Sequence, residues 1–232
     1  MSEAEERLDA RDGRVIHEII PVGWLQCNCS ILGDAGTREA LVIDPGDEVE
    51  VIQRMLARHG LRVKMIVSTH AHIDHAGGLR KLHDLTGAPV LMHRDDLELY
   101  QALDAQAAWL GLPEPETGDV DHFLKEDDTL RWGGFEARVL HTPGHTPGSI
   151  SLYFPGSGGR MAIPGPQVFA GDTLFAGSIG RTDLWGGSLE KIMRSLREKL
   201  MELPDETTVF PGHGETTSIG RERTCNPFLG EA

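Results

Sequence analysis

The sequence lacks any run of 18 consecutive apolar residues, so no segment of it is predicted to cross a membrane as a helix. Its first residues, MSEAEERLDARDGR, are acidic and polar and lack the apolar stretch of a secretory signal peptide. With 39% hydrophobic and 25% charged residues, the composition is typical of a globular protein. We therefore expect a cytoplasmic protein in which a flexible tail, residues 1–14, precedes a single domain, residues 15–232.

Cysteine is also scarce, because the 232 residues include only Cys27, Cys29 and Cys225. An odd number of cysteines, two of them separated by a single residue, does not make a disulfide framework. We expect reduced cysteines, as in a cytosolic protein. Cys27 and Cys29 would face the same side of a strand, so a thiol metal site is an alternative, although no histidine neighbours them in sequence.

Basic side chains are outnumbered by acidic ones. The chain has 22 Lys and Arg against 36 Asp and Glu, a net charge of -14. Binding a phosphate backbone requires a basic surface, so this balance argues against a nucleic acid partner. Two bound divalent cations would offset about four of the negative charges. We expect a small-molecule partner and neither nucleic acid nor membrane, and the sequence contains no signal for an oligomeric state.

What the sequence does contain is a set of potential metal ligands in four short blocks, THAHIDHAGG, HTPGHTPGS, AGDTLFAG and FPGHGE. These side chains offer nitrogen and oxygen donors without a thiolate, which suits zinc, iron or manganese. Their number is sufficient for two ions held side by side if one carboxylate is shared. The sequence therefore predicts two divalent metal ions, zinc in preference to iron or manganese, bound by His70, His72, Asp74, His75, His145, Asp172 and His213.

The first block follows an apolar, β-branched segment, VKMIVST (residues 63–69), which predicts a buried strand. Residues two apart on extended backbone point to the same side, so His70, His72 and Asp74 are expected to converge. His75 is expected at the start of a helix that ends at Gly87.

The other blocks have the pattern of a strand that runs into a turn. Two X-Pro steps and two glycines restrict the loop around His145. Asp172 and His213 each follow a short apolar segment, QVFAG and TTVF, so both are expected at strand ends. His141 ends a strand just before the His145 loop and is expected to support it. A shared Asp172 would complete two sites of four ligands each.

Apolar periodicity predicts alternating strands and helices in two similar halves. The expected strands are residues 15–21, 28–32, 40–43, 63–69, 90–93, 135–142, 149–154, 167–172 and 207–212. The expected helices are residues 47–59, 76–87, 95–110 and one that begins after the N-cap Ser188. The fold class is α/β, an αββα sandwich of two mixed β-sheets with helices on the outer faces and the metals at one edge.

The motifs THAHIDH, HTPGHTPGS, GDTLFAGSIGRTDL and PGHGE follow one another between residues 70 and 215, and VIDPGD and NCSIL lie upstream. In these motifs the chain resembles metallo-β-lactamase-fold hydrolases, and among them the short, single-domain branch of the glyoxalase II (hydroxyacylglutathione hydrolase) group. The resemblance implies the metallo-β-lactamase fold and one metal held by His70, His72 and His145. It implies a second metal held by Asp74, His75 and His213, with Asp172 bridging the two.

The resemblance also concerns residues around the metals. It implies that Asp44 is a buried carboxylate that orients a ligand histidine. Arg181 and Asp183, in the GSIGRTD loop, either lie beside the substrate or pair with each other. After the last ligand the chain continues only through TTSIGRERTCNPFLGEA, which contains no glutathione-binding pattern. The Gly- and Pro-rich residues 155–167 predict a long hairpin loop near the site, which either shapes the substrate or has no function there, and the second alternative is preferred.

The expected activity is metal-dependent thioester hydrolysis. Water on such a metal has its pKa lowered to about 7. The hypothesis is that a hydroxide bridging the two ions attacks the thioester carbonyl, with Asp74 as the catalytic residue that accepts a hydrogen bond from it. A thioester is preferred to an amide because a thiolate leaves without a general acid, and none stands out near the motifs.

Three alternatives remain. A persulfide dioxygenase of the same fold uses one iron, held by residues that match His70, His145 and Asp172. Its loop carries Cys-Gly-Arg where this chain has Ile179, Gly180 and Arg181, which favours the hydrolase. A β-lactamase is disfavoured because the resemblance of this chain to those enzymes does not extend to GSIGRTDL. The metal site of those enzymes also has no bridging aspartate. A metal-binding module without activity is the third.

Overall fold

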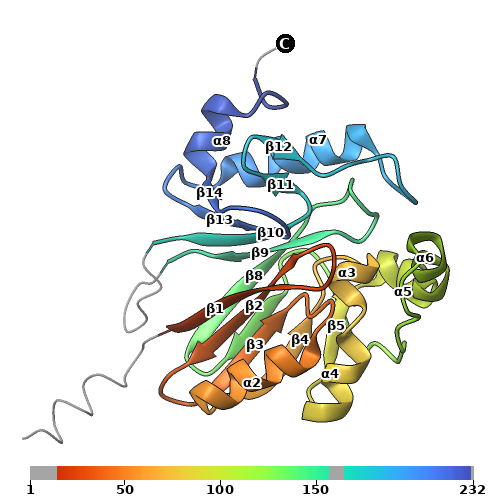
Figure 1. Ribbon diagram of the computed structural model, residues 1–232. Helices are drawn as coiled ribbons and strands as arrows, with labels where there is room; N and C mark the ends of the chain where they lie inside the picture. Colours follow the sequence, from red (N-terminus) through yellow and green to blue (C-terminus); the bar gives the residue numbers. More distant parts are fainter. Residues whose placement is uncertain (1–14, 157–164, 231–232) are drawn as a thin grey trace, which may run out of the picture.

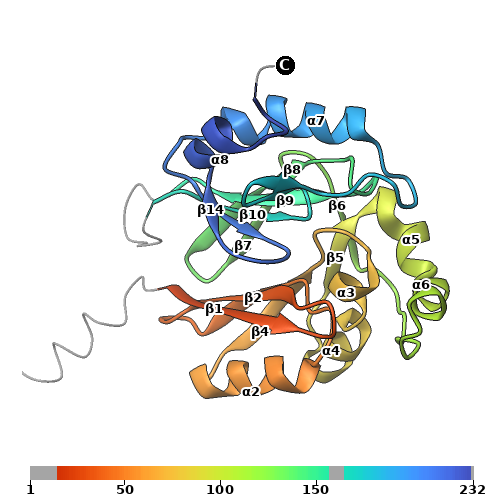
Figure 2. The same cartoon turned by 45° about the horizontal axis from the view of Figure 1, so that its top comes forward.

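The fold is seen in a computed structural model, which describes residues 15–156 and 165–230. Within this part of the chain, two six-stranded sheets pack face to face and helices cover both outer faces (Figures 1 and 2). This is the four-layer αββα sandwich of the metallo-β-lactamase fold that the sequence predicts. The predicted tail, residues 1–14, and residues 157–164 of the predicted hairpin loop lie outside the described residues.

The first sheet has the order β1-β2-β3-β4-β5-β6. Antiparallel pairing joins β1 to β2 and β2 to β3, and parallel pairing continues from β3 to β6. Side chains alternate across the sheet, so that Ala40 and Val42 face the helices while Leu41 and Ile43 face the second sheet. The strands are β1 (Val15–Val22), β2 (Cys27–Asp34), β3 (Glu39–Ile43), β4 (Arg62–Val67), β5 (Val90–His93) and β6 (His122–Leu124).

The second sheet has the order β14-β13-β10-β9-β8-β7. It is antiparallel except where β10 pairs with β13 in parallel. Its inner face contributes Trp132, Phe154 and Phe169 to the apolar layer between the sheets. The strands are β7 (Thr129–Trp132), β8 (Phe135–His141), β9 (Ile150–Phe154), β10 (Gln167–Gly171), β13 (Thr208–Pro211) and β14 (Thr217–Ser218), beside a small hairpin of β11 (Leu174–Phe175) and β12 (Ser178–Ile179).

Helices bury apolar faces against each sheet. α2 (Val49–His59) and α4 (Leu79–Thr86) pack on the first sheet with α3 (Ile73–Ala76), η1 (Arg94–Asp96), α5 (Leu97–Gln101) and α6 (Leu103–Leu110). On the second sheet α7 (Leu189–Glu198) packs with η2 (Leu200–Glu202) and α8 (Ile219–Cys225). Ser188 caps α7 as predicted, because its side chain accepts a hydrogen bond from Lys191 N. None of the helices in the described part of the chain has the length and apolarity needed to span a bilayer.

The predicted helix over residues 76–87 is divided into α3 and α4 at Gly77 and Gly78. These glycines allow the backbone to approach the turn after β3: a Cβ on Gly78 would lie 2.1 Å from Pro45 O, and a Cβ on Gly77 would lie 2.7 Å from Gly46 O. The predicted end at Gly87 is confirmed, since Gly87 caps α4 in the left-handed conformation. Similarly, the helix predicted over residues 95–110 is divided into η1, α5 and α6.

The two ends of the loop between β9 and β10 that the structure describes lie away from the predicted metal site, whereas the sequence-based expectation placed the loop near it. Phe154 pairs with Gln167 at one end of the hairpin, whereas Ile150 and Gly171 lie at the other end, beside the predicted ligands. The four residue steps from Ile150 to Phe154 separate the two ends by about 13 Å. The described ends of residues 155–167 are therefore remote from the ligands (Figure 1).

Candidate metal centre

The predicted ligands lie at one edge of the sandwich, where strands from both sheets end. Four come from the connection between β4 and α4, and the others follow β8, β10 and β13. Ile150 N donates a hydrogen bond to Thr69 O at 2.8 Å, which ties β9 to the chain leaving β4. The structure thereby gathers all of the sequence-predicted ligands at this edge: His70, His72, Asp74, His75, His145, Asp172 and His213.

The reason predicted for this convergence, an extended chain from residue 63 to residue 74, is wrong. β4 ends at Val67, because Thr69 N donates to the Asp44 side chain rather than to a neighbouring strand. His72 is the extended N-cap of α3, and Asp74 lies in the first turn of that helix. A loop and a helix start, not an alternating strand, bring these side chains together.

One group of donor atoms comes from three histidines. His72 Nδ1 lies 3.1 Å from His70 Nε2 and 2.9 Å from His145 Nε2. For comparison, the edge of a tetrahedron with zinc–nitrogen bonds of about 2.0 Å measures about 3.3 Å. Nitrogens this close, on rings that meet nearly at right angles, form a donor set suited to one divalent ion.

A second group joins α3 to the loop after β13. His213 Nε2 lies 3.2 Å from His75 Nε2 and 3.0 Å from Asp74 Oδ2, and the latter oxygen is 3.7 Å from His75 Nε2. Two nitrogens and a carboxylate oxygen again meet within the span of one coordination sphere.

Asp172 lies between the two groups. Its Oδ1 is 3.4 Å from His75 Nε2, while its Oδ2 is 3.6 Å from His145 Nε2 and 3.8 Å from His213 Nε2. Oδ1 is buried and has no hydrogen-bond partner within the described residues. An ionised carboxylate oxygen left in this state is costly, and a cation satisfies it. The donor set therefore fits divalent metal ions, with a carboxylate that faces both groups.

The ring nitrogens that point away from the centre are held by oxygen atoms. His145 Nδ1 donates to Arg181 O at 2.8 Å, and His213 Nδ1 donates to Leu25 O at 3.0 Å. Each bond leaves the lone pair of Nε2 directed at the centre, as in the outer hydrogen bonds of metal-bound histidines. His141, expected to support the His145 loop, has Nε2 3.0 Å from Pro147 O in that loop.

Asp44 lies behind His75, where the resemblance places an orienting carboxylate. Its Oδ2 is 3.0 Å from His75 Nδ1, and the same carboxylate accepts from Thr69 N at 2.6 Å and from Thr69 Oγ1 at 2.7 Å. Thr69 Oγ1 lies in turn 3.2 Å from His70 Nδ1, so Asp44 orients one histidine of each group. It is buried and has φ 51°, a strained backbone for a non-glycine residue.

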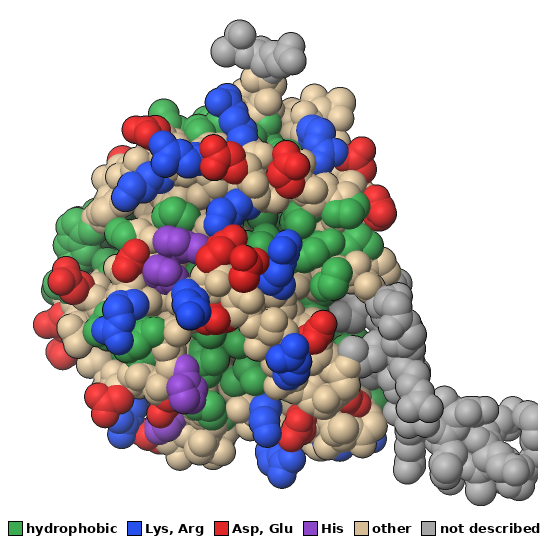
Figure 3. Space-filling model, turned by 180° about the vertical axis from the view of Figure 1, so that it is seen from behind, with side chains coloured by type: hydrophobic (Ala, Val, Ile, Leu, Met, Phe, Trp, Pro, Cys, Tyr) green, Lys and Arg blue, Asp and Glu red, His purple; other side chains and the backbone are tan. Residues whose placement is uncertain are grey.

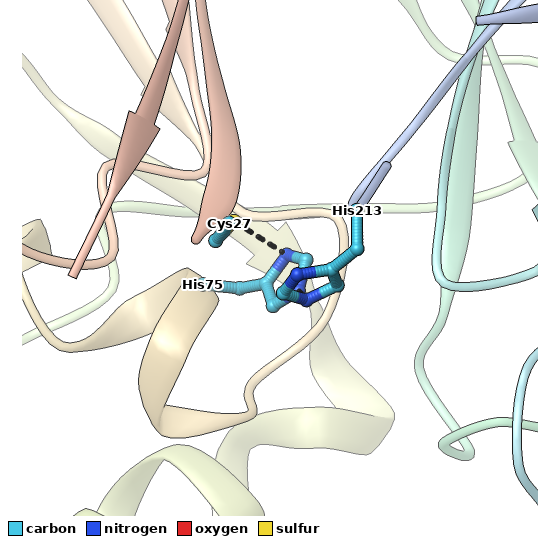
Figure 4. A group of neighbouring side chains, drawn as sticks. All are labelled: Cys27, His75 and His213. Atoms are coloured by element: carbon cyan, nitrogen blue, oxygen red, sulfur yellow. Dashed lines mark hydrogen bonds between the residues drawn. The ribbon is translucent and has the colours of Figure 1, made fainter. Parts of the chain in front are cut away.

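Cys27 lies beside the same imidazole, a contact that the sequence does not reveal because β2 and α3 meet only in the tertiary structure. Its Sγ is 3.5 Å from His75 Nδ1, and Cys27, His75 and His213 form one cluster of potential ligands (Figure 4). Burial raises the pKa of Cys27 to about 12. Its Sγ lies beside Nδ1, whereas Nε2 is the nitrogen of His75 that faces the other donors, so Cys27 packs behind this imidazole.

Two further positioning residues were missed in the sequence. Asp96, fully buried, accepts from Ala71 N at 3.0 Å, from Thr146 Oγ1 at 2.7 Å and from Gly148 N at 2.6 Å, so it joins the His70 loop to the His145 loop. Burial raises the pKa of Asp96. Gln106 Oε1 accepts from Ile73 N at 3.0 Å. An acid directly after a buried strand, as in HRDD, is the signal that marks Asp96.

Charge at the centre favours a bound cation. Burial lowers the pKa of His72 to about 3, and burial together with neighbouring histidines lowers the pKa of His70, so both histidines remain neutral donors.

The carboxylates of the centre are ionised. Burial alone would raise the pKa of Asp74 and Asp172, but the neighbouring histidines hold the pKa of both below the usual value. Burial also opposes a proton on His75, yet the surrounding carboxylates raise its pKa. The carboxylates that favour a proton on His75 also favour a metal ion beside it.

Gly212 lets the loop after β13 approach the centre. A Cβ at this position would lie 2.2 Å from Asp172 Oδ1 and 2.6 Å from His75 Cε1. No larger residue fits without moving a predicted ligand. Asn28 holds the same loop, since its Nδ2 donates to Pro211 O and to Gly214 O, both at 3.0 Å.

A cavity of about 560 Å³ opens over the centre. Arg181 and Asp183 both line it, and they also pair with each other, with Nε to Oδ1 at 2.7 Å and Nη2 to Oδ2 at 2.9 Å. The two outcomes expected for this pair are thus both observed. The lining of the whole cavity consists of Leu25, His72, Ile73, Asp74, Gln106, Trp109, Leu110, His145, Asp172, Arg181, Asp183, Leu184 and Trp185.

Comparison with known proteins agrees with the fold. Residues 22–213 match the metallo-beta-lactamase superfamily. The chain belongs to this superfamily. Metallo-β-lactamase superfamily proteins bind divalent metals, and the clusters described above are able to hold them.

Relatives within the superfamily match nearly the whole chain. An uncharacterized protein of Aquifex aeolicus is 42% identical, with 94% of this chain and 98% of the relative covered. Hydroxyacylglutathione hydrolase GloC of Haemophilus influenzae is 38% identical, with 91% of this chain and 97% of the relative covered.

Solved structures agree with these relatives. The BLEG-1 B3 metallo-beta-lactamase has a TM-score of 0.82 at 36% identity over 93% of this chain and 100% of that chain. TTHA1623, solved in a di-iron-bound form, has a TM-score of 0.78 at 40% identity over 91% and 100%. ETHE1 from Myxococcus xanthus has a TM-score of 0.76 at 29% identity over 94% and 86%.

Proposed function

We propose that this protein is a metal-dependent thioester hydrolase of the hydroxyacylglutathione hydrolase (glyoxalase II) type, with two divalent metal ions. The observation that carries the proposal is the position of Asp172, whose carboxylate lies within 3.8 Å of donors of both groups while its Oδ1 has no hydrogen bond in the described structure. One ion would be held by His70, His72 and His145, the other by Asp74, His75 and His213, with Asp172 shared.

The comparisons support both the reaction and the number of metal ions in this proposal. The GloC relative is named as a hydroxyacylglutathione hydrolase, and TTHA1623 was solved with two irons. Zinc is the first choice of metal and iron or manganese the alternatives, because imidazole and carboxylate donors accept all three. A cytoplasmic location is proposed with it, since Cys27, Cys29 and Cys225 are all free.

Two divalent ions, when bound, lower the pKa of water to about 7 and polarise a carbonyl oxygen. The protein residues then orient the reactants. Asp74, held ionised by His75 and His213, lines the cavity and would accept a hydrogen bond from the attacking water as the catalytic residue. Gln106, Leu110 and Trp109 cover one side of the cavity and reduce its access to bulk water.

A thioester suits this cavity better than an amide does. An amine must be protonated as it leaves, whereas a thiolate departs without a general acid. Among the described lining residues, the carboxyl groups of Asp74, Asp172 and Asp183 all have a lowered pKa and remain ionised at neutral pH. They therefore supply no proton to an amine.

The decisive experiment combines elemental analysis of protein purified without added metal with hydrolysis of S-lactoylglutathione and of simpler thioesters. About two metals per chain, with hydrolysis that disappears on chelation and returns with metal, would support the proposal. Oxygen consumption with glutathione persulfide at one iron per chain would replace it with the persulfide dioxygenase. Turnover of a β-lactam without thioester turnover would show a lactamase, and metal without any turnover a binding module.

A further inference from the structure

Three of the four tryptophans are exposed in the structure, which is unusual for so large an apolar side chain. Trp24, Trp109 and Trp185 are 74%, 68% and 57% exposed, whereas Trp132 is buried between the sheets. Trp109 lies in α6 and Trp185 in the loop before α7, far apart in the sequence, yet both line the cavity over the candidate metal centre. Packing of the fold does not require them there, so their position points to a ligand.

The remaining walls of this cavity are also apolar. Leu25, Ile73, Leu110 and Leu184 stand beside the two tryptophans, and the predicted ligands Asp74, His145 and Asp172 belong to the same lining. A volume of about 560 Å³ falls within the range of small-molecule sites. A reacting group at the metals would therefore be attached to a part of the substrate that lies against aromatic and aliphatic surface.

The cavity offers no free positive side chain to a carboxylate. Its one cationic residue in the described lining, Arg181, is held by both oxygens of Asp183 in a bidentate pair. Asp74 and Asp172 are assigned above to the two metal ions, so their charges are neutralised there. A substrate carboxylate that lies against the tryptophans, away from the metals, would have to displace Asp183 to reach a cation.

A second cavity, of about 460 Å³, adjoins the first and shares Leu25, Ile73 and Asp74 with it. Its lining adds Trp24 and the acids Asp47, Glu114 and Glu116. The cationic residue described there, Lys81, pairs with Glu50 Oε1 at 2.5 Å. Neither cavity therefore resembles a site for glutathione, which carries two carboxylates. The two adjoining cavities together are called the cleft below.

We propose that the cleft selects thioesters in which a flat apolar group, such as an arylacyl chain, lies against Trp109 and Trp185 and in which no carboxylate is present. The proposal rests on the metal-dependent thioester hydrolysis proposed above, and it narrows the substrate class from glutathione thioesters to thioesters without a carboxylate. Stacking of an aromatic ring and burial of its apolar area together are expected to change kcat/KM by roughly tenfold or more.

The kinetic test compares thioesters of one small neutral thiol, N-acetylcysteamine. Acetyl, phenylacetyl and 4-carboxyphenylacetyl thioesters differ only in the acyl group. The phenylacetyl compound is expected to have a kcat/KM at least tenfold above the acetyl compound, and the added carboxylate is expected to remove this gain. Equal kcat/KM for all three, or preference for the carboxylated compound, would overturn the proposal.

Variants assign the effect to the tryptophans. Trp109→Ala and Trp185→Ala are expected to lower the phenylacetyl to acetyl ratio about tenfold, mainly through KM. Phe228→Ala removes an aromatic side chain of similar exposure that lines neither cavity, and it should preserve the ratio. A ratio that is unchanged in both tryptophan variants would contradict the assignment.

A binding measurement separates this proposal from the proposed function. Titration of tryptophan fluorescence with the thioether S-(2-phenylethyl)-N-acetylcysteamine, in which a methylene group replaces the thioester carbonyl, reports occupation of the cleft without thioester turnover. Binding that is weakened at least tenfold in Trp109→Ala, without any thioester turnover, would reject the hydrolase and retain the apolar cleft. Thioester turnover without thioether binding or acyl preference would retain the hydrolase and reject the cleft assignment.

Discussion

Asp44 Oδ2 lies 3.0 Å from Nδ1 of His75, so a buried carboxylate fixes the side of the imidazole that faces away from the candidate metal centre. The same carboxylate reaches His70 through Thr69 Oγ1. A single side chain thus orients one histidine in each group of donors, and it does so from a backbone with φ 51°. This arrangement explains why the turn DPGD after β3 belongs to the site although it contributes no predicted ligand.

Replacement of this carboxylate tests its role. Asp44→Asn keeps the shape and tolerates a positive φ, but it removes the charge that favours the Nδ1–H tautomer of His75. We expect metal affinity to fall about 10- to 100-fold, measured by competition with a chelator. Asp127→Asn, at an exposed position with φ 64°, is the matched control. Equal metal affinity in Asp44→Asn and the natural protein would contradict the role.

Gly212 gives a test of close packing at the centre. In Gly212→Ala the new methyl group would meet Asp172 Oδ1 at 2.2 Å, so the loop carrying His213 has to move outward. We expect metal content to fall to about one per chain or less and hydrolysis to drop at least about 100-fold, because a misplacement of about 1 Å has this cost. Gly230→Ala, where a Cβ meets nothing within 4 Å, should behave as the natural protein. Full metal content in Gly212→Ala would show that the loop adapts.

Asp96 is expected to affect the stability of the fold more than the rate of the reaction. Asp96→Ala leaves Ala71 N, Gly148 N and Thr146 Oγ1 without their acceptor in a buried region. We expect the free energy of unfolding in urea to fall by roughly 4 kcal/mol. Asp95→Ala, next to it but exposed, should change the value by less than about 0.5 kcal/mol. Similar losses in both variants would rule out the loop-joining role.

His17 introduces a dependence of stability on pH that is separate from the metals. Burial lowers its pKa from 6.5 to about 4, against the opposing effect of Glu18, and its ring packs edge-on against Phe169 and Phe210. The pKa of His17 in the folded protein lies below its value in the unfolded chain. The stability that its neutral, buried ring contributes is therefore complete above pH 6.5 and is lost as the pH falls toward 4.

The measurement is urea unfolding at pH 7 and pH 4.5. The natural protein should lose about 2 kcal/mol more than His17→Phe does over this interval, after allowance for partial exposure. His122→Phe alters an exposed histidine and should retain the natural pH dependence. An identical loss in His17→Phe and the natural protein would remove His17 as the source.

Charge on the surface is consistent with the expectation of a small-molecule partner. On the face opposite to that of Figure 1, Lys and Arg alternate with Asp and Glu and form no continuous basic surface (Figure 3). Acidic and basic side chains also pair with each other, as Arg194 does with Glu190 and Lys199 with Glu126. The absence of nucleic acid and membrane partners stays a prediction.

Local sequence patterns predicted the elements that depend on neighbouring residues. The strand Val90–His93, the cap at Ser188 and the stop at Gly87 were all found as expected, because β-branched runs, caps and left-handed glycines act over a few residues. The short strands β6, β7 and β14 and the helix α8 were not predicted. They have too few residues for a clear period and are formed by pairing and packing with distant segments.

The sequence by itself predicted the donor set, from the density of His and Asp in four motifs, and it determined the layered fold, through apolar periodicity and the resemblance of its motifs. Only the tertiary structure decided how the donors meet. Asp96 between two loops, Cys27 behind His75, the pairing of Arg181 with Asp183 and the gathering of Trp109 and Trp185 all join segments far apart in the chain. Such contacts are set by the packing of one sheet on the other, which no local pattern encodes.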